Sequence, residues 1–137
     1  MPPSVEAVCV DPKRVHEVWP TVAPLIKKAM ARGDLGTFDC VEADVLSARA
    51  LLWVAWADPF ILGAAVTQII GSEQGKVCLI VACGGKRVDL WLNLIEKIEE
   101  YAKAESCRCT RIMGRKGWAR LLSDYQIARV VIEKDLR

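Results

Sequence analysis

The segment from Lys76 to Cys83 is the feature that most limits what this chain can fold into. After its first residue it is wholly apolar, which is typical of a strand buried on both faces of a sheet. Glycines bound it, at Gly75 before it and at Gly84-Gly85 after it. Glycine pairs mark turns. The segment therefore predicts a strand at the sheet centre that is broken by Gly84-Gly85-Lys86-Arg87.

A long amphipathic helix follows this strand. Apolar residues recur at three- and four-residue steps from Val88, and the opposite face is charged, which predicts a helix that ends near Ser106. Cys109 to Met113 is the next short strand. Since a helix separates it from the strand before, we expect the two strands to be parallel and joined by a right-handed crossover.

The N-terminal third predicts a strand and then a helix. Val5 to Val10 alternates and stops at Asp11-Pro12, where proline suits the first turn of a helix. The apolar spacing then continues to Arg32-Gly33. Pro20 and Pro24 each remove a backbone donor within this helix, so we expect it to be kinked or broken near Trp19.

The remaining elements are shorter. A small helix with an acidic cap near Asp39 precedes a β-hairpin, and a short helix and a last strand end the chain. The hairpin strands are Leu51 to Trp56 and Ile61 to Ile70, the short helix is Trp118 to Leu122 and the last strand is Ala128 to Glu133.

Composition sets the class of protein. The chain has 137 residues, 53% of them hydrophobic, which predicts one domain spanning residues 1–137. Its formal net charge is +2, too balanced for capture of a polyanion by net charge alone. The start lacks the basic and apolar regions of an export signal, and no apolar run reaches the roughly 20 residues of a membrane span. We therefore expect a soluble cytoplasmic protein with reduced thiols and no membrane partner.

Six cysteines and one histidine do not predict a metal site. Cys78, Cys83, Cys107 and Cys109 lack the paired Cys-x-x-Cys spacing of a zinc knuckle, and His16 lies far from them on the first helix. We expect Cys78 and Cys83 to behave as small core residues.

The order of elements resembles the Gcn5-related N-acetyltransferase (GNAT) superfamily over nearly the whole chain. The residues that carry the resemblance are Leu52 to Trp56, Gly63 to Val66, Val77 to Gly85, Val88 to Ser106, and Gly114 to Leu122. The last stretch is similar to a poorly characterised branch that is frequent among phage and prophage proteins. The resemblance implies an α/β fold with a mixed, mostly antiparallel twisted sheet flanked by helices, and a V-shaped splay between its central strands.

The resemblance also implies a cosubstrate, acetyl-CoA, lying in that splay. Independently of the family, successive amides at a helix N-terminus bind anions, and the glycines, Lys86 and Arg87 suit a pyrophosphate there. The cofactor-binding residues expected on this basis are Ile80, Val81, Ala82, Cys83, Gly84, Gly85, Lys86, Arg87 and Val88.

The catalytic residues implied by the family fall on three positions. Acetyltransferases of this kind often carry a tyrosine after the short helix as general acid toward the thiolate. Ser123 stands at that position here, and Tyr125 lies two residues further on. The general base is often a glutamate on the strand before the glycine loop, and the nearest carboxylate here is Glu73 in the preceding turn.

Two functions remain open at this point. The first is transfer of an acetyl group from acetyl-CoA to an unknown amine by direct attack. The second is a non-catalytic GNAT-like binding protein, phage-associated or nucleic-acid-handling, that has lost the catalytic acid and base. A basic cluster around Trp118 could clamp nucleic acid, but the modest net charge makes this partner the less favoured choice. The cluster comprises Arg108, Arg111, Arg115, Lys116 and Arg120. The sequence leaves both a monomer and a homodimer open.

Overall fold

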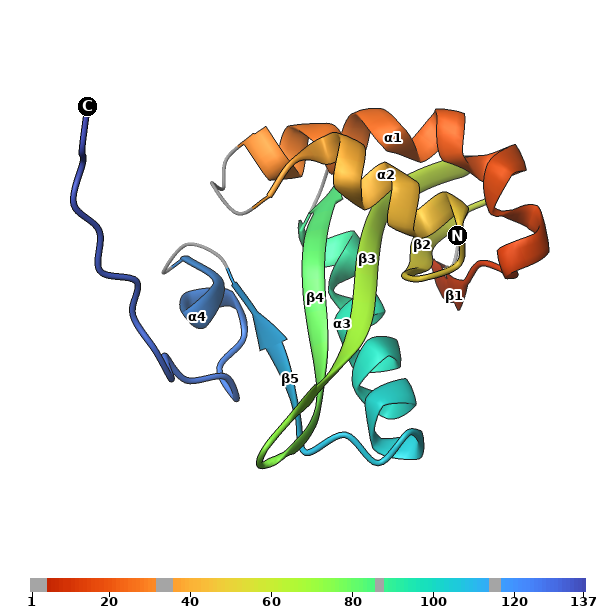
Figure 1. The fold of residues 1–137 in the computed structure, drawn as a ribbon. Helices are drawn as coiled ribbons and strands as arrows, with labels where there is room; N and C mark the ends of the chain where they lie inside the picture. The colour runs from red at the N-terminus through yellow and green to blue at the C-terminus, as the bar shows by residue number, and fades with distance from the viewer. Residues whose placement is uncertain (1–4, 32–35, 86–87, 114–116) are drawn as a thin grey trace.

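The computed structural model describes residues 5–31, 36–85, 88–113 and 117–137. Five strands form one sheet in the order β1-β2-β3-β4-β5 (Figure 1). The first three junctions are antiparallel, and β4 and β5 are parallel, as the intervening helix predicts. The strands are β1 (Glu6–Cys9), β2 (Leu51–Ala57), β3 (Phe60–Ser72), β4 (Gly75–Gly85) and β5 (Cys109–Ile112).

Helices cover both faces of the sheet (Figure 1). One face carries α1 (Val15–Ala31), which follows a 3-10 turn over Pro12–Arg14, and α2 (Phe38–Leu46). The other face carries α3 (Val88–Ala104). A short helix, α4 (Gly117–Leu121), follows β5. This is the mixed α/β architecture, mostly antiparallel and flanked by helices, that the element order predicts.

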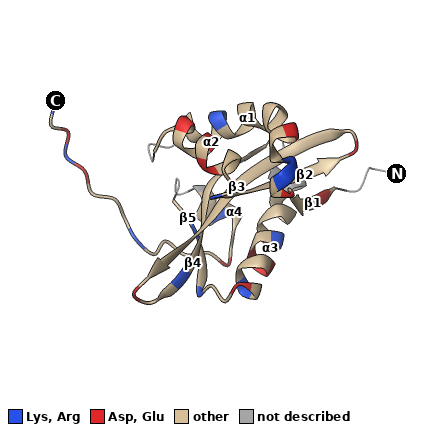
Figure 2. Cartoon of the chain, turned by 45° about the vertical axis from the view of Figure 1, so that its right-hand side comes forward, with Lys and Arg blue, Asp and Glu red and all other residues tan. Residues whose placement is uncertain are grey.

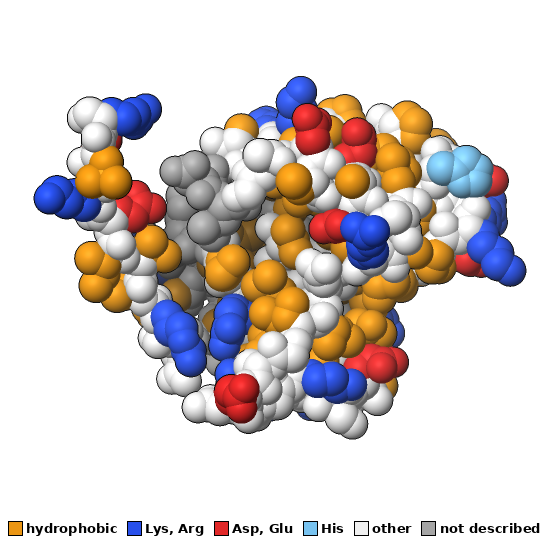
Figure 3. Space-filling model, in the orientation of Figure 1, with side chains coloured by type: hydrophobic (Ala, Val, Ile, Leu, Met, Phe, Trp, Pro, Cys, Tyr) orange, Lys and Arg blue, Asp and Glu red, His pale blue; other side chains and the backbone are white. Residues whose placement is uncertain are grey.

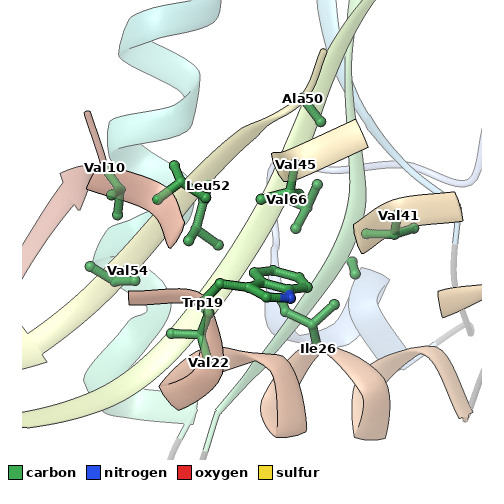
Figure 4. Close-up of a cluster of buried hydrophobic side chains, with 13 residues drawn as sticks. Val10, Trp19, Val22, Ile26, Val41, Val45, Ala50, Leu52, Val54 and Val66 are labelled. Carbon is green, nitrogen blue, oxygen red and sulfur yellow. The ribbon is translucent and has the colours of Figure 1, made fainter. Parts of the chain in front are cut away.

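The core on the α1 face is built around Trp19 (Figure 4). Its indole lies among aliphatic side chains of α1, α2 and the sheet, including Ile26 and Leu52, both fully buried. Its Nε1 donates a hydrogen bond of 2.7 Å to the Glu42 carboxylate of α2. One residue of α1 therefore fixes both the sheet contact and the position of the neighbouring helix.

The core on the α3 face uses the alternate residues of the same strands. Trp53 and Ala55 of β2 pack against Leu94, Ile95 and Ile98 of α3. The Trp53 indole Nε1 donates a hydrogen bond of 2.9 Å to the hydroxyl of Thr67, which is 1% exposed. A polar pair at this depth is tolerated because each group satisfies the other.

Of the two outcomes expected at Pro20 and Pro24, a break into two pieces does not occur, because α1 is continuous from Val15 to Ala31. Both prolines are exposed, and so is His16 one turn earlier on the same side of the helix. The carbonyl groups that lose their amide donors therefore face solvent, which can hydrate them. Burial of the opposite side of α1, at Val22 and Ile26, holds the helix together.

Two boundaries differ from the sequence expectation. The cap of α2 is Thr37, whose hydroxyl accepts a hydrogen bond of 3.3 Å from the Cys40 amide, and Asp39 lies in the first turn. Strand β4 is not broken at Gly84-Gly85: it runs through Gly85, because both glycines remain paired with β3. It also lies fourth in the sheet, between β3 and β5, so β3 holds the middle position.

The last predicted strand does not form. Residues 128–133 pair with no described strand, and every residue from Gln126 to Arg137 is exposed. The sequence pattern is strand-like, but a strand needs a partner ladder, which a local pattern cannot supply. Within the described residues, no helix has both the length and the apolar composition needed to cross a membrane.

Candidate cofactor site

Strands β4 and β5 separate after a short paired region. Their register runs from Val77 opposite Cys109 to Ile80 opposite Ile112, where β5 ends. Strand β4 continues from Val81 to Gly85, which is an edge of about 16 Å at ~3.3 Å per residue. No described strand pairs with this edge on the side that faces away from β3. In an antiparallel ladder, alternate residues direct their N–H and C=O groups to that side, so the edge offers backbone hydrogen-bonding groups.

A β-bulge at Val81 marks the start of the open edge. Val66 of β3 pairs with Ala82, and the next residue, Thr67, pairs with Ile80, which leaves Val81 as the extra residue. Packing agrees, since Val81 and Ala82 both contact the α1-side core although they are consecutive. A bulge bends a strand and raises its twist. Here it turns β4 at the point where β5 ends.

The sequence pattern does not reveal this bulge. In a strand whose two faces are both apolar, an extra residue leaves no break in an alternating pattern. The nearest available signal is the length of the apolar run in β4, and that length does not locate the extra residue.

The open edge leads directly to the N-terminal end of α3, which begins at Val88. A helix of 17 residues carries partial positive charge and unpaired amides at this end, and both favour an anion. Lys86 and Arg87, the two cations expected to bind the pyrophosphate, lie outside the described residues.

Gly84 has a structural reason to be glycine. A Cβ at this position would lie 3.1 Å from the Cβ of Ala29 and 3.2 Å from the backbone oxygen of Leu25, both in α1. Helix α1 thus sits directly on the backbone of β4. The sequence predicts that a phosphate approaches the backbone closely at the two glycines. At Gly84 that space is occupied by α1, whereas Gly85, at the end of the strand, is exposed.

Tyr125 lies beside the region in which β4 and β5 are paired. Its hydroxyl donates a hydrogen bond of 2.6 Å to the Glu99 carboxylate of α3 and is also hydrogen-bonded to the Thr110 hydroxyl of β5. Thr110 is opposite Cys78, which precedes Gly84 by six positions along β4. Burial, followed by the bond to the Glu99 carboxylate, raises the pKa of the Tyr125 phenol well above its usual range. The structure does not bring this hydroxyl to the end of β4.

The other two expected catalytic residues are exposed. Glu73 lies in the turn between β3 and β4, at the opposite end of β4 from Gly85. Ser123 follows α4. Trp118, within α4, and Leu122, directly after it, both pack against the core on the α3 face. The structure therefore brings the backbone groups of the expected site together, and it does not gather Glu73 and Tyr125 around them.

The cysteine thiol in this part of β4 is not suited to act as a nucleophile. All six cysteines are unpaired, and burial raises the pKa of the Cys83 thiol to about 12. Cys83 is therefore a neutral thiol at physiological pH and a poor nucleophile. The described residues contain no group of three or more His, Cys, Asp or Glu side chains arranged to hold a metal ion.

The surface charge is mixed. Figure 2 shows basic and acidic residues interspersed over α1, α3 and the C-terminal tail. Of the expected basic cluster, Arg108 and Arg120 are exposed and Arg111 is partly buried, whereas Arg115 and Lys116 lie outside the described residues.

No protein-family model matches the chain, and no curated protein matches it in sequence. Solved structures do match its fold. An aminoglycoside N-acetyltransferase in complex with CoA superposes with a TM-score of 0.70 at 15% identity, covering 100% of this chain and 98% of that chain. A GNAT family acetyltransferase from Staphylococcus aureus gives 0.68 at 11% identity, covering 97% and 99%. This chain has the GNAT fold.

A third structure with the GNAT fold holds a ligand. It is a predicted acetyltransferase from Clostridium acetobutylicum with acetyl-CoA, which has a TM-score of 0.67 at 10% identity, and the match covers 96% of each chain. Identities this low show similarity of fold and assign no role to individual residues of this chain.

Proposed function

We propose that this protein is an acetyl-CoA-dependent N-acyltransferase that transfers an acetyl group to an amine by direct attack. The observation that carries the proposal is the open edge of β4, from the bulge at Val81 to Gly85, ending at the N-terminus of α3. Structures with the same fold that contain CoA or acetyl-CoA support it.

The residues present fit such a ligand. The backbone edge from Val81 to Gly85 would hold the two amides of the pantetheine arm, as an added strand would be held. The α3 N-terminus, together with Lys86, Arg87 and the Val88 amide, would hold the pyrophosphate. Ile80 and Cys83 pack into the core on the α3 face and would hold that edge in position.

When bound, acetyl-CoA supplies an acetyl thioester that an amine can attack. The contribution of the chain is orientation and electrostatics. Edge N–H groups of β4, fixed by the ladder to β3, would donate to the carbonyl oxygen on which negative charge develops. Holding the two reactants together lowers the entropic part of the barrier. Cys83 stays protonated and forms no acyl intermediate.

A second candidate function is favoured by the position of Tyr125. Its hydroxyl is already hydrogen-bonded to Glu99 and Thr110, and Glu73 lies at the far end of β4. In this second proposal, the chain keeps the GNAT fold and the ligand site but performs no transfer, and it acts as a binding protein. In the first proposal, Ser123 and Tyr125 remain the candidates for the acid and Glu73 for the base.

Titration of the full chain with CoA tests the ligand site that both proposals share, and an acetylation assay then separates the two. We expect calorimetric heat and NMR shifts of the amides from Val81 to Gly85, with the amide of Gly75 at the other end of β4 unchanged. Binding to the native state alone raises stability by about 2.7 kcal/mol at a 100-fold excess over Kd, so the melting temperature should also rise.

Charge reversal tests the anion site. Lys86→Glu with Arg87→Glu should weaken CoA binding more than folding. The matched control is Lys76→Glu with Arg108→Glu, the same change of charge at the opposite end of β4. If millimolar CoA gives neither heat nor shifts, the ligand assignment is rejected. If CoA binds but no amine in a broad panel is acetylated, the binding function replaces the transferase.

A further inference from the structure

Strand β5 forms an outer edge of the sheet. It pairs with β4 on one side, and among the described strands it has no neighbour on the other. Edge strands expose unpaired N–H and C=O groups that accept a further strand. Met113, directly after β5, is 51% exposed, so an apolar side chain lies at the end of this unpaired edge.

The C-terminal tail, residues 126–137, has the properties of the missing strand. All of it is exposed, and it holds five strongly exposed apolar side chains, four of which are the most exposed among the described residues. Figure 3 shows these side chains on an arm that stands away from the body. Soluble monomers rarely expose so many neighbouring apolar residues. They are Ile127 (60%), Val130 (73%), Val131 (74%), Ile132 (91%) and Leu136 (88%).

We propose that the tail of one copy pairs antiparallel with β5 of a second copy, and that the exchange is mutual about a two-fold axis. Tyr125 anchors the start of the tail beside Thr110 of β5. From there the tail runs in the direction of the β5 arrow (Figure 1). Within one copy the two segments are thus parallel. A two-fold axis perpendicular to the strands makes the tail antiparallel to the partner copy's β5.

Charge and apolar character select one register. With Ile112 opposite Ile132, Arg111 faces Glu133 and Met113 faces Val131. Ile112 contacts the α3-side core, so the Ile112–Ile132 pair would extend that core. The other two pairs lie on the opposite face, because side chains alternate along a strand. Opposite charges and apolar pairs directly across a ladder both stabilise it.

The first test is the oligomeric state of the full chain by light scattering. We expect twice the chain mass of 15.2 kDa. Ile132→Asp should yield the single-chain mass. The matched control, Phe60→Asp, alters another exposed apolar residue, at the start of β3, and should leave the dimer intact. A wild-type chain of single mass, or a dimer that persists in Ile132→Asp, overturns the proposal.

A charge exchange tests the register. Arg111→Glu and Glu133→Arg should each raise the dimer Kd by roughly tenfold, since each places like charges opposite one another. Combined in one chain, they should restore the wild-type Kd. Failure of the double variant to recover contradicts this register, whatever the single variants do.

A cross-link distinguishes exchange from pairing within one copy. Met113→Cys chains are mixed with Val131→Cys chains and oxidised, and a disulfide-linked peptide joining the two introduced cysteines is sought by mass spectrometry. Exchange predicts this link. Phe60→Cys mixed with Val131→Cys is the control and should give none. If the link forms only when both substitutions share one chain, the tail pairs with its own β5 and the proposal fails.

Discussion

The Tyr125 hydroxyl donates a 2.6 Å hydrogen bond to the Glu99 carboxylate across the α3 face of the sheet. Because its proton is used in that bond, the Thr110 hydroxyl is left to donate to the Tyr125 oxygen. One side chain thereby joins the segment after α4 to both α3 and β5. These two hydrogen bonds hold α3 and β5 together beside the region where β5 pairs with β4.

Replacing Tyr125 should therefore cost stability. Tyr125→Phe removes both hydrogen bonds and leaves two partly buried partners, and we expect the free energy of unfolding to fall by about 1–2 kcal/mol in urea denaturation. The control is Tyr101→Phe, which keeps the edge contact with Trp53, at 5.5 Å between ring centroids, and for which the structure shows no hydrogen bond to a described residue. An unchanged midpoint for Tyr125→Phe would contradict this role. If acetyl transfer is found, the same variant tests whether the phenol is its acid.

The pH dependence of stability should fall on the alkaline side. Burial raises the pKa of both tyrosines, Tyr101 and Tyr125, with the Glu99 hydrogen bond adding to the shift at Tyr125. A raised native pKa means that the unfolded chain loses these protons first, near pH ~10. The stability that the two protonated tyrosines contribute is therefore fully present below pH ~10 and declines as the pH rises above it. Absorbance at 295 nm follows tyrosinate directly. Ionisation of both phenols in the native protein at the usual pH would refute the expectation.

Gly84→Ala should destabilise the fold through α1. The added Cβ meets the Leu25 backbone oxygen at 3.2 Å and the Ala29 Cβ at 3.1 Å, and a backbone oxygen cannot move without moving the helix. We expect a loss of about 1–3 kcal/mol in thermal or urea unfolding. Gly71→Ala, in β3 with nothing within 4 Å, is the control. Adding Ala29→Gly to Gly84→Ala should recover part of the loss, and no recovery would show that the contact is not the cause.

The cysteines should alkylate in a defined order. Cys40 is exposed, whereas Cys78 is buried, and burial raises the pKa of Cys78 to about 11 and that of Cys83 to about 12. Thiolate is the reactive form, so iodoacetamide at pH 8 should label Cys40 first and the two β4 thiols last. Peptide mass spectrometry against time reads the order. Denatured protein, in which all six thiols are accessible, supplies the reference rates.

The sequence by itself determined the order and type of most elements. The apolar run of β4 and the helical period of α3 both record which side chains are buried, and burial is read from local spacing. The parallel pairing of β4 with β5 followed from the long helix between them. Local spacing and chain connectivity therefore account for the mixed sheet and for the helices that cover it.

Tertiary structure alone decided where backbone groups find partners. The bulge at Val81, the continuation of β4 through Gly85, and the unpaired tail at residues 128–133 all depend on a neighbouring strand that is distant in sequence. The continuity of α1 across Pro20 depends on solvent on one side and the sheet on the other. Local periodicity reports the burial of side chains and does not report hydrogen-bond partners. The open edge of β4, on which the proposed function rests, is a property of non-local pairing.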